Sequence, residues 1–258
     1  MNNYSNFFKE IKLIKVLAPM AGITNAKFVS KLIPYGFDMV TLGGYNTDSK
    51  TIAAGKKIIN RGRNEFDIAK DDLISTIEKE ANLIKKKYPI KVSANLRAIS
   101  PDPIIEISKI KTLDVVELNC HCRQKEILDI GCGQSMVEDI DFLTDFVKNI
   151  VKKSKSQVSV KIRANINGID TLKVAKVIDN LSVDYIHIDA MKPGFTYADL
   201  VTISKVASET DTFLIGNNSI TSIEDANAMI NAGADGISIA RAAINGKINF
   251  NLKKIKKL

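Results

Sequence analysis

The chain has 258 residues, of which 45% are apolar and 26% are charged. This length suits an α/β barrel that folds as one unit, and the composition excludes a disordered chain. The formal net charge of +8 permits a polyanionic partner, although the Lys runs are dispersed and a Lys-rich proteome would explain them equally well.

Targeting segments and disulfides are not expected. The first twenty residues carry charges within their apolar part and no small-residue cleavage site, and no apolar run approaches the roughly 20 residues that span a membrane. The cysteines, Cys120, Cys122 and Cys132, are odd in number and share one short segment, which favours a reducing compartment. We therefore expect a cytoplasmic protein whose cysteines belong to a site.

Short β-branched runs alternate with stretches of helical periodicity along the chain. The runs are near-continuously apolar, which is typical of parallel strands covered on both faces. They lie at 16–18, 39–42, 90–96, 115–119, 158–163, 185–189, 213–217 and 236–240. Amphipathic helices are expected at 71–87, 141–153, 170–181 and 222–233, the last with a capping-box spacing at its start.

This alternation predicts a single-domain (β/α)8 TIM barrel over residues 1–258 rather than a doubly wound sheet. Segment 43–70 is expected to be a long irregular connection, of the kind that is often functional or mobile.

In such a barrel the site lies where the strands end, and polar residues occupy nearly every one of these positions. A barrel with a purely structural role would not need them. These positions hold Asn95, Arg97, 119–123, Lys161, Arg163, His187, Asp189, 217–218 and Arg241.

The last two strands predict a phosphate site. Each ends in small residues before a helix, so that backbone N–H groups and the helix dipole face an anion, and Arg241 adds a charge. The alternative is that Gly216 and Gly233 merely shape turns.

Several motifs together resemble the dihydrouridine synthase family of flavoenzymes. They are LAPMAGITNAKF at 17–28, VELNCHC at 116–122, GCGQSM at 131–136, VKIR at 160–163 and IGNNSITSIEDANAMINAGADGISIAR at 215–241. The resemblance covers nearly the whole barrel. It implies an FMN-dependent TIM barrel that reduces uracil rings in tRNA.

The resemblance also implies roles for individual residues. Those implied for the cofactor are Pro19, Met20, Ala21, Asn95, Lys161, His187, Asn217, Asn218, Ala240 and Arg241, with Asn95 standing where the family has Gln. Those implied for the substrate are Asn119, Arg123 and Arg163. Cys122, Lys161 and His187 would be catalytic, with Cys122 as the proton donor.

Each catalytic role has a plainer alternative. Cys122 could be a small buried apolar residue, and His187 a core histidine with satisfied hydrogen bonds. Lys161 ends an apolar strand, where an ammonium needs a ligand or an acidic partner. Cys120, His121, Cys122 and Cys132 could instead bind zinc or an iron–sulfur cluster, but Cys-x-Cys alternates faces on a strand, so no metal is expected.

Some motifs depart from the family. His121-Cys122-Arg123 replaces Gly-Cys-Pro, residues 187–190 replace His-Gly-Arg-Thr, and the helical domain that follows the barrel has no counterpart, as expected of a short, archaeal-type variant. Basic loop residues could compensate in binding RNA. The candidates are Arg61, Arg63, Arg123 and Lys192.

Three functions therefore stay open: reduction of uracil in tRNA, dihydroorotate-dehydrogenase-like oxidoreduction of a free pyrimidine, and flavin binding without catalysis. Because no G-x-G-x-x-G fingerprint is present, NAD(P)H as electron donor would visit the flavin site only transiently. The sequence does not indicate the oligomeric state.

Overall fold

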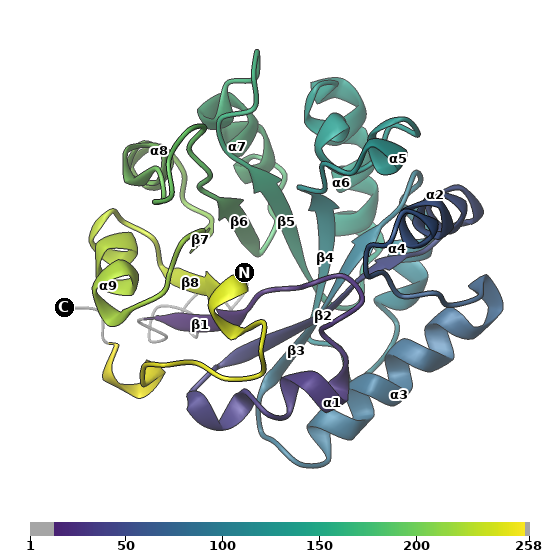
Figure 1. The fold of residues 1–258 in the computed structure, drawn as a ribbon. Helices are drawn as coiled ribbons and strands as arrows, with labels where there is room; N and C mark the ends of the chain where they lie inside the picture. The colour runs from purple at the N-terminus through teal and green to yellow at the C-terminus, as the bar shows by residue number, and fades with distance from the viewer. Residues whose placement is uncertain (1–12, 256–258) are drawn as a thin grey trace, which may run out of the picture.

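The computed structural model describes residues 13–255 and contains eight parallel strands that close into a barrel in sequence order (Figure 1). The strands are β1 (Ile14–Leu17), β2 (Met39–Asn46), β3 (Lys91–Arg97), β4 (Val115–Cys120), β5 (Gln157–Arg163), β6 (Tyr185–Asp189), β7 (Phe213–Asn217) and β8 (Gly236–Ile239). Each coincides with a predicted run, so the predicted TIM barrel is confirmed. The terminal residues of the predicted 1–258 domain lie outside the described residues.

Helices surround the barrel, and each predicted helix is found within a few residues of its predicted ends. The α-helices are α1 (Ala26–Val29), α2 (Ser49–Asn60), α3 (Leu73–Lys85), α4 (Asp102–Ile107), α5 (Lys125–Leu128), α6 (Ile140–Lys153), α7 (Thr171–Asp179), α8 (Leu200–Glu209) and α9 (Ile223–Asn231). Short 3-10 turns are η2 (Ile33–Tyr35), η3 (Lys70–Asp72), η4 (Gly133–Val137), η5 (Arg241–Ala243) and η6 (Leu252–Lys254).

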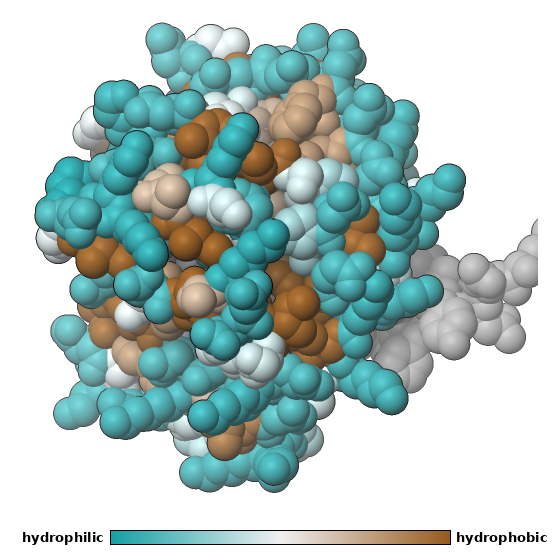
Figure 2. Space-filling model, turned by 90° about the vertical axis from the view of Figure 1, so that its right-hand side faces the viewer, coloured by the Kyte–Doolittle hydropathy of each residue, from teal (hydrophilic) through white to brown (hydrophobic). Residues whose placement is uncertain are grey.

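The main core lies between the barrel and this ring of helices. The outward-facing strand residues, such as Val40, Val92 and Val160, pack against the buried stripes of the helices in one continuous cluster. The outer helix faces are polar, and on the side of the molecule seen in Figure 2 the apolar residues show as separate patches among hydrophilic ones. Among the described residues, no helix is both long and apolar enough to cross a membrane.

The side chains inside the barrel change from apolar to polar along its axis. An apolar cluster, formed mainly by Ile14, Val16, Met39, Val115 and Ile215, fills the end where the strands begin. Further along the strands the buried inward positions are polar, and they include Thr41, Ser93, Asn95, Glu117, Ser159, Lys161, His187 and Ser238. Because barrels of this type are normally filled by bulky aliphatic side chains, these polar positions require an explanation at the site.

The prediction of an irregular connection at 43–70 is wrong for most of its length. Strand β2 continues to Asn46, and α2 occupies residues 49–60. Asp48 begins α2 with a reciprocal capping box to Thr51, and Gly55 inside the helix lies so close to the Asn46 side chain that a Cβ atom would collide with it. The internal glycine thus allows α2 to pack tightly on the end of β2.

Asp48 also joins α2 to the β3–α4 connection, because its second carboxylate oxygen accepts a hydrogen bond from Ile99 N at 2.9 Å. We expect Asp48→Ala to lower the free energy of unfolding by about 1–2 kcal/mol, because the N-cap and this bond are both lost. Urea denaturation measures the change. Asp48→Asn, which retains a capping oxygen, should lose clearly less, and equal losses in the two variants would contradict the capping role.

Candidate active site

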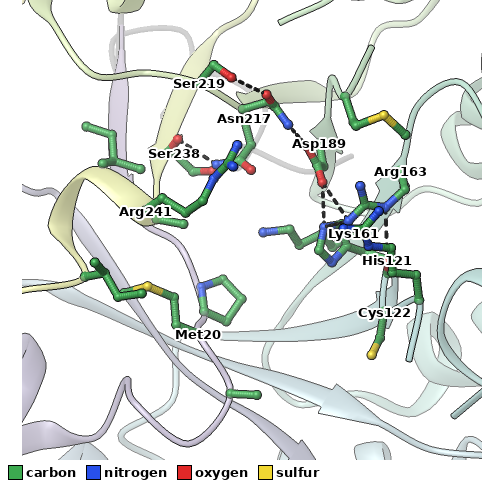
Figure 3. A pocket seen from close by; sticks show the side chains of 18 of the residues that line it. Met20, His121, Cys122, Lys161, Arg163, Asp189, Asn217, Ser219, Ser238 and Arg241 are labelled. Carbon is green, nitrogen blue, oxygen red and sulfur yellow. Dashed lines mark hydrogen bonds and ion pairs between the residues drawn. The ribbon is translucent and has the colours of Figure 1, made fainter. Parts of the chain in front are cut away.

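A large cavity of about 1380 Å³ opens where the strands end. Its wall includes residues from or just after every strand, and Figure 3 shows how those from β1, β4, β5, β6, β7 and β8 face it. Cavities that hold one small ligand usually measure about 300–1,000 Å³. The cavity therefore has room for two ligands side by side.

The structure brings together all but one of the site residues predicted from the sequence. Those that line the cavity are Pro19, Met20, Ala21, Asn95, Asn119, Cys122, Arg123, Lys161, Arg163, Asn217, Asn218, Ala240 and Arg241. His187 is the exception. It is fully buried and does not line the cavity, because its position lies two residues before the end of β6.

Glu117 is the centre of a buried network below the cavity floor. Its Oε1 accepts a hydrogen bond from Asn95 Nδ2 at 2.8 Å, and its Oε2 lies 3.0 Å from Ser159 Oγ and 2.8 Å from His187 Nδ1. Burial alone would raise its pKa, but the contact with His187 and the charge of Lys161 hold the pKa of Glu117 at about 2. Glu117 is therefore ionised at any physiological pH.

His187 is neutral in this network. Burial, together with the positive charge of Lys161, lowers the pKa of the imidazole below its ordinary value. We assign its proton to Nδ1, which faces the Glu117 carboxylate, so that Nε2 accepts from Ser238 Oγ at 2.6 Å. His187 thereby connects Glu117 to Ser238, which does line the cavity.

A second chain of hydrogen bonds runs from Glu117 to the residue proposed as the acid. Asn95 donates to Glu117, and Asn119 Nδ2 donates to Asn95 Oδ1 at 2.7 Å. Asn119 Oδ1 in turn accepts from Cys122 N at 2.9 Å. Two amide side chains thus fix the turn after β4. Gly44 makes room for them, since a Cβ atom there would lie 2.7 Å from Asn95 Oδ1.

Lys161 is a buried ammonium without a bonded partner. Its side chain is 3% exposed, lines the cavity, and forms no hydrogen bond or ion pair with any residue in 13–255. Burial lowers its pKa, and the carboxylates of Glu117 and Asp189 oppose this shift. An unpaired cation at this depth is costly unless a ligand supplies the opposite charge.

Arg97 presents a second buried donor at the same cavity. One end of its guanidinium is held by Glu65 at 2.8 Å and by Asn46 at 3.1 Å, whereas its Nε has no partner among the described residues. Because a buried N–H without an acceptor costs roughly 1–3 kcal/mol, this group also favours a polar ligand.

The mouth carries a compact cluster around Asp189. His121 Nε2 lies 2.7 Å from Asp189 Oδ2, and Arg163 Nη2 lies 3.1 Å from the same oxygen (Figure 3). Burial lowers the pKa of His121 to about 4, so the ring is neutral at pH 7. The hydrogen bond to His121 and the charge of Arg163 outweigh burial and lower the pKa of Asp189.

The loop after β7 has an unusual backbone. Asn218 and Ser219 have φ angles of 110° and 52°, in the left-handed region that non-glycine residues seldom adopt. Asn218 Nδ2 donates to Asp189 Oδ1 at 2.6 Å, which holds the loop in place. The backbone N–H groups of Asn218, Ser219 and Arg241 donate to no acceptor within 13–255. Successive free amides of this kind form anion-binding concavities.

The expected helix directly after β8 is absent. The described residues after β8 form the 3-10 turns η5 and η6 and no α-helix, so the dipole of a long helix cannot assist at this position. An anion here would be held by loop amides and by the Arg241 side chain.

The three cysteines are buried free thiols that make different contacts. Cys120 Sγ contacts Met136 Sδ at 3.8 Å, and Cys132 Sγ donates to Ala98 O at 3.5 Å. The thiol of Cys122 points away from the Asp189 cluster (Figure 3). Cys122 packs in one cluster with Ile127 and Cys132. Within the described residues, no group of three or more His, Cys, Asp or Glu could hold a metal ion.

The model of the dihydrouridine synthase family matches residues 16–255. The chain belongs to this family. Members of the family are flavin-dependent oxidoreductases, and this chain is therefore a flavin-dependent oxidoreductase.

Individual relatives differ in how much of their length they share. An uncharacterized protein, MJ0144 of Methanocaldococcus jannaschii, is 36% identical over 94% of this chain and 93% of its own length. A probable tRNA-dihydrouridine synthase of Rickettsia typhi is 24% identical over 88% of this chain, which spans only 65% of that protein. FabK from Thermotoga maritima shares the fold, with a TM-score of 0.56, 13% identity, and coverage of 93% of this chain and 61% of FabK.

Sequence reasoning missed several residues that face the cavity. Glu65 lines it and was assigned no role, and the same holds for the loop at 191–197 apart from Lys192. His121 lines it too, but it was considered only as a possible metal ligand and as one of the polar residues at the mouth. His121 could have been found from its position next to Cys122 at the end of a strand. Glu65 could not, because its contact with Arg97 depends on how the segment after α2 folds back.

Glu117→Gln tests the buried network. We expect a loss of about 2–3 kcal/mol in the free energy of unfolding at pH 7, because the variant removes a charged acceptor of several hydrogen bonds. A carboxyl whose folded pKa is about 2, against an ordinary 4.5, stabilises the fold above pH 4.5 and loses this effect as the pH falls toward 2. The difference between wild type and variant should therefore shrink below pH 4.5.

Urea denaturation between pH 7 and pH 3 measures this difference. The matched control is Glu106→Gln, at an exposed residue paired with Lys109, which should change stability by no more than about 0.5 kcal/mol. A loss that stays constant across this pH range would show that the charge of Glu117 is not responsible.

Proposed function

We propose that this chain binds FMN across the mouth of the barrel and reduces the 5,6 double bond of a uracil ring in tRNA. The observation that carries the proposal is the buried Lys161 ammonium, which has no bonded partner among the described residues and lines a cavity with room for two ligands. Membership of the family implies that the cofactor is a flavin, so the residues that line the cavity should suit a flavin.

The residues present fit FMN. Lys161 would face the carbonyl-bearing pyrimidine edge of the flavin ring, which accumulates negative charge on reduction. Pro19, Met20 and Ala21 offer an apolar wall for the ring. The free amides of Asn218 and Ser219, with Arg241, suit a phosphate. Asn217, Asn218 and Ala240 complete that end of the cavity.

Bound and reduced FMN would supply the hydride for one carbon of the uracil double bond. The protein must then deliver a proton to the other carbon from the opposite face of the ring. We assign this step to the Cys122 thiol, whose S–H bond breaks as the new C–H bond forms, after which the thiolate takes a proton from solvent. Asn119 fixes the backbone of Cys122 through the 2.9 Å hydrogen bond to its N–H.

Other residues would position the substrate and take no part in making or breaking bonds. Arg163 and Arg123 line the cavity beside Cys122 and can donate to the carbonyl oxygens of the base. We assign His187 an indirect role, because it is bonded to Glu117 and Ser238 and does not reach the cavity. NAD(P)H would reduce the flavin by visiting the same mouth transiently.

The charge of the rim supports a polyanionic substrate. Arg63, Arg123, Lys192 and Arg241 all line the cavity. Arg61, the remaining basic candidate, is occupied by an ion pair with Glu126 at 2.8 Å. A free pyrimidine would not require this distribution of charge.

Lys161→Met tests the flavin site. We expect the affinity for FMN to fall at least about tenfold, because a charge-assisted contact is lost. The stability of the apo variant should change by no more than about 1 kcal/mol, because losing the cost of burying the ammonium offsets losing its attraction to Glu117 and Asp189. Flavin fluorescence titration and urea denaturation measure the two quantities. Lys148→Met, at an exposed Lys on α6, is the control. Unchanged FMN affinity would refute the assignment of Lys161.

The substrate is tested by reoxidation of the reduced, FMN-loaded chain. We expect tRNA that lacks dihydrouridine to reoxidise the flavin and to acquire dihydrouridine, and we expect orotate and free uracil to do neither at comparable rates. Binding of tRNA should weaken steeply with added salt, since phosphates are the main contacts.

Cys122→Ala tests whether the thiol donates the proton without contributing to binding. The variant should retain FMN and tRNA affinity while its turnover falls about 100-fold or more, as expected when a general acid is lost. Reoxidation by orotate alone would favour the free-pyrimidine function. Failure of every substrate would favour a flavin-binding protein without this chemistry.

A further inference from the structure

The loop between β6 and α8 presents two large aromatic side chains to solvent at the edge of the cavity. Phe195 is 53% exposed and Tyr197 is 52% exposed, and both line the cavity. Their ring centroids lie 4.9 Å apart at an angle of 51°. Exposed apolar surface on the rim of a binding site commonly marks the place where a ligand or partner is bound.

This loop is held at both of its ends. Asn165, in the connection after β5, donates through Nδ2 to Met191 O at 2.7 Å and to Asp199 Oδ2 at 3.0 Å. Asp199 N donates to Ala190 O at 2.8 Å, which closes the base of the loop. The rings are therefore presented from a fixed base, and a ligand that stacks on them loses less free energy to ordering the loop.

A cation accompanies the two rings. Lys192 Nζ lies 4.8 Å from the centroid of Phe195 and 5.5 Å from that of Tyr197. Aromatic faces beside a positive charge match the two parts of a nucleotide, since the base stacks on the rings while the ammonium pairs with the phosphate. Arg63 and Arg123 line the same cavity and extend the positive rim.

We propose that Phe195 and Tyr197 form a stacking platform for a base of RNA that adjoins the uridine bound in the cavity. The inference rests on the proposed tRNA function and adds the place where a flanking nucleotide is held. The platform requires a single-stranded or splayed base, because the bases inside a paired helix have no free face. Binding there would select a uridine within a polynucleotide over a free uridine.

The test uses the full FMN-loaded chain and short single-stranded RNAs with one central uridine. The first RNA carries every base. In the second RNA an abasic residue replaces the base on the 5′ side of the uridine, and in the third it replaces the base on the 3′ side. Affinities are measured at fixed salt for the wild type, for Phe195→Ala/Tyr197→Ala, and for Phe142→Ala. Phe142 is 40% exposed on α6 and does not line the cavity, so it is the matched control.

In the wild type and in Phe142→Ala, removal of one flanking base should cost about tenfold in affinity. In the double alanine variant the intact RNA should bind about tenfold more weakly, and removal of that base should cost nothing further. The affinity for FMN should stay unchanged. Tyr197→Phe, which preserves the ring, should behave as the wild type.

Different failures lead to different conclusions. If the wild type binds RNA and the double variant is still sensitive to both abasic substitutions, the platform is wrong and the tRNA function stands. If the double variant changes only the Michaelis constant for NAD(P)H, the rings serve the reductant and the platform is wrong. If the wild type binds no RNA and modifies no tRNA, the proposed function and the platform fail together.

Discussion

The structure depends on how a buried carboxylate and a buried ammonium share the inside of one barrel. Glu117 already has three hydrogen-bonding neighbours, on Asn95, Ser159 and His187, and so its negative charge is satisfied within the protein. Lys161 has no such partner among residues 13–255 and faces the cavity. Hydrogen bonds within the protein thus stabilise the charge of Glu117, whereas a bonded partner for the charge of Lys161 has to come from a ligand.

The same network determines where the reacting group stands. The chain from Glu117 through Asn95 and Asn119 ends on the backbone N–H of Cys122, so the turn that carries the thiol is connected to the charged layer beneath the cavity. Its links are amide side chains on adjacent strands, whose separation is set by the parallel pairing of β3 and β4. A substitution anywhere along this chain would act on the position of Cys122 without touching a substrate.

The sequence predicted the barrel well because parallel strands buried on both faces leave a simple pattern, and every one of the eight runs was a strand. It did not predict how far along the barrel axis each inward-facing polar side chain lies from the mouth. His187 and Asp189 both point inward on β6, yet their positions are about 6–7 Å apart along the strand, and only Asp189 reaches the mouth. It also missed α2, whose glycine and polar residues hide the helical pattern, and the contact of Glu65 with Arg97, which depends on tertiary folding.

Asp189 shows why the replacement of the family's motif after β6 need not abolish the site. It is a buried carboxylate in a mouth that also carries several Arg and Lys side chains, and it joins His121, Arg163 and Asn218, which come from three different segments. One oxygen orders the side where a base would bind, while the other fixes the loop whose free amides suit a phosphate. Because Asp189 alone orients residues at both ends of the cavity, the remaining positive charge lies on Lys161 and on the basic residues of the rim. Those are the places where an anionic cofactor and a polyanionic substrate would need it.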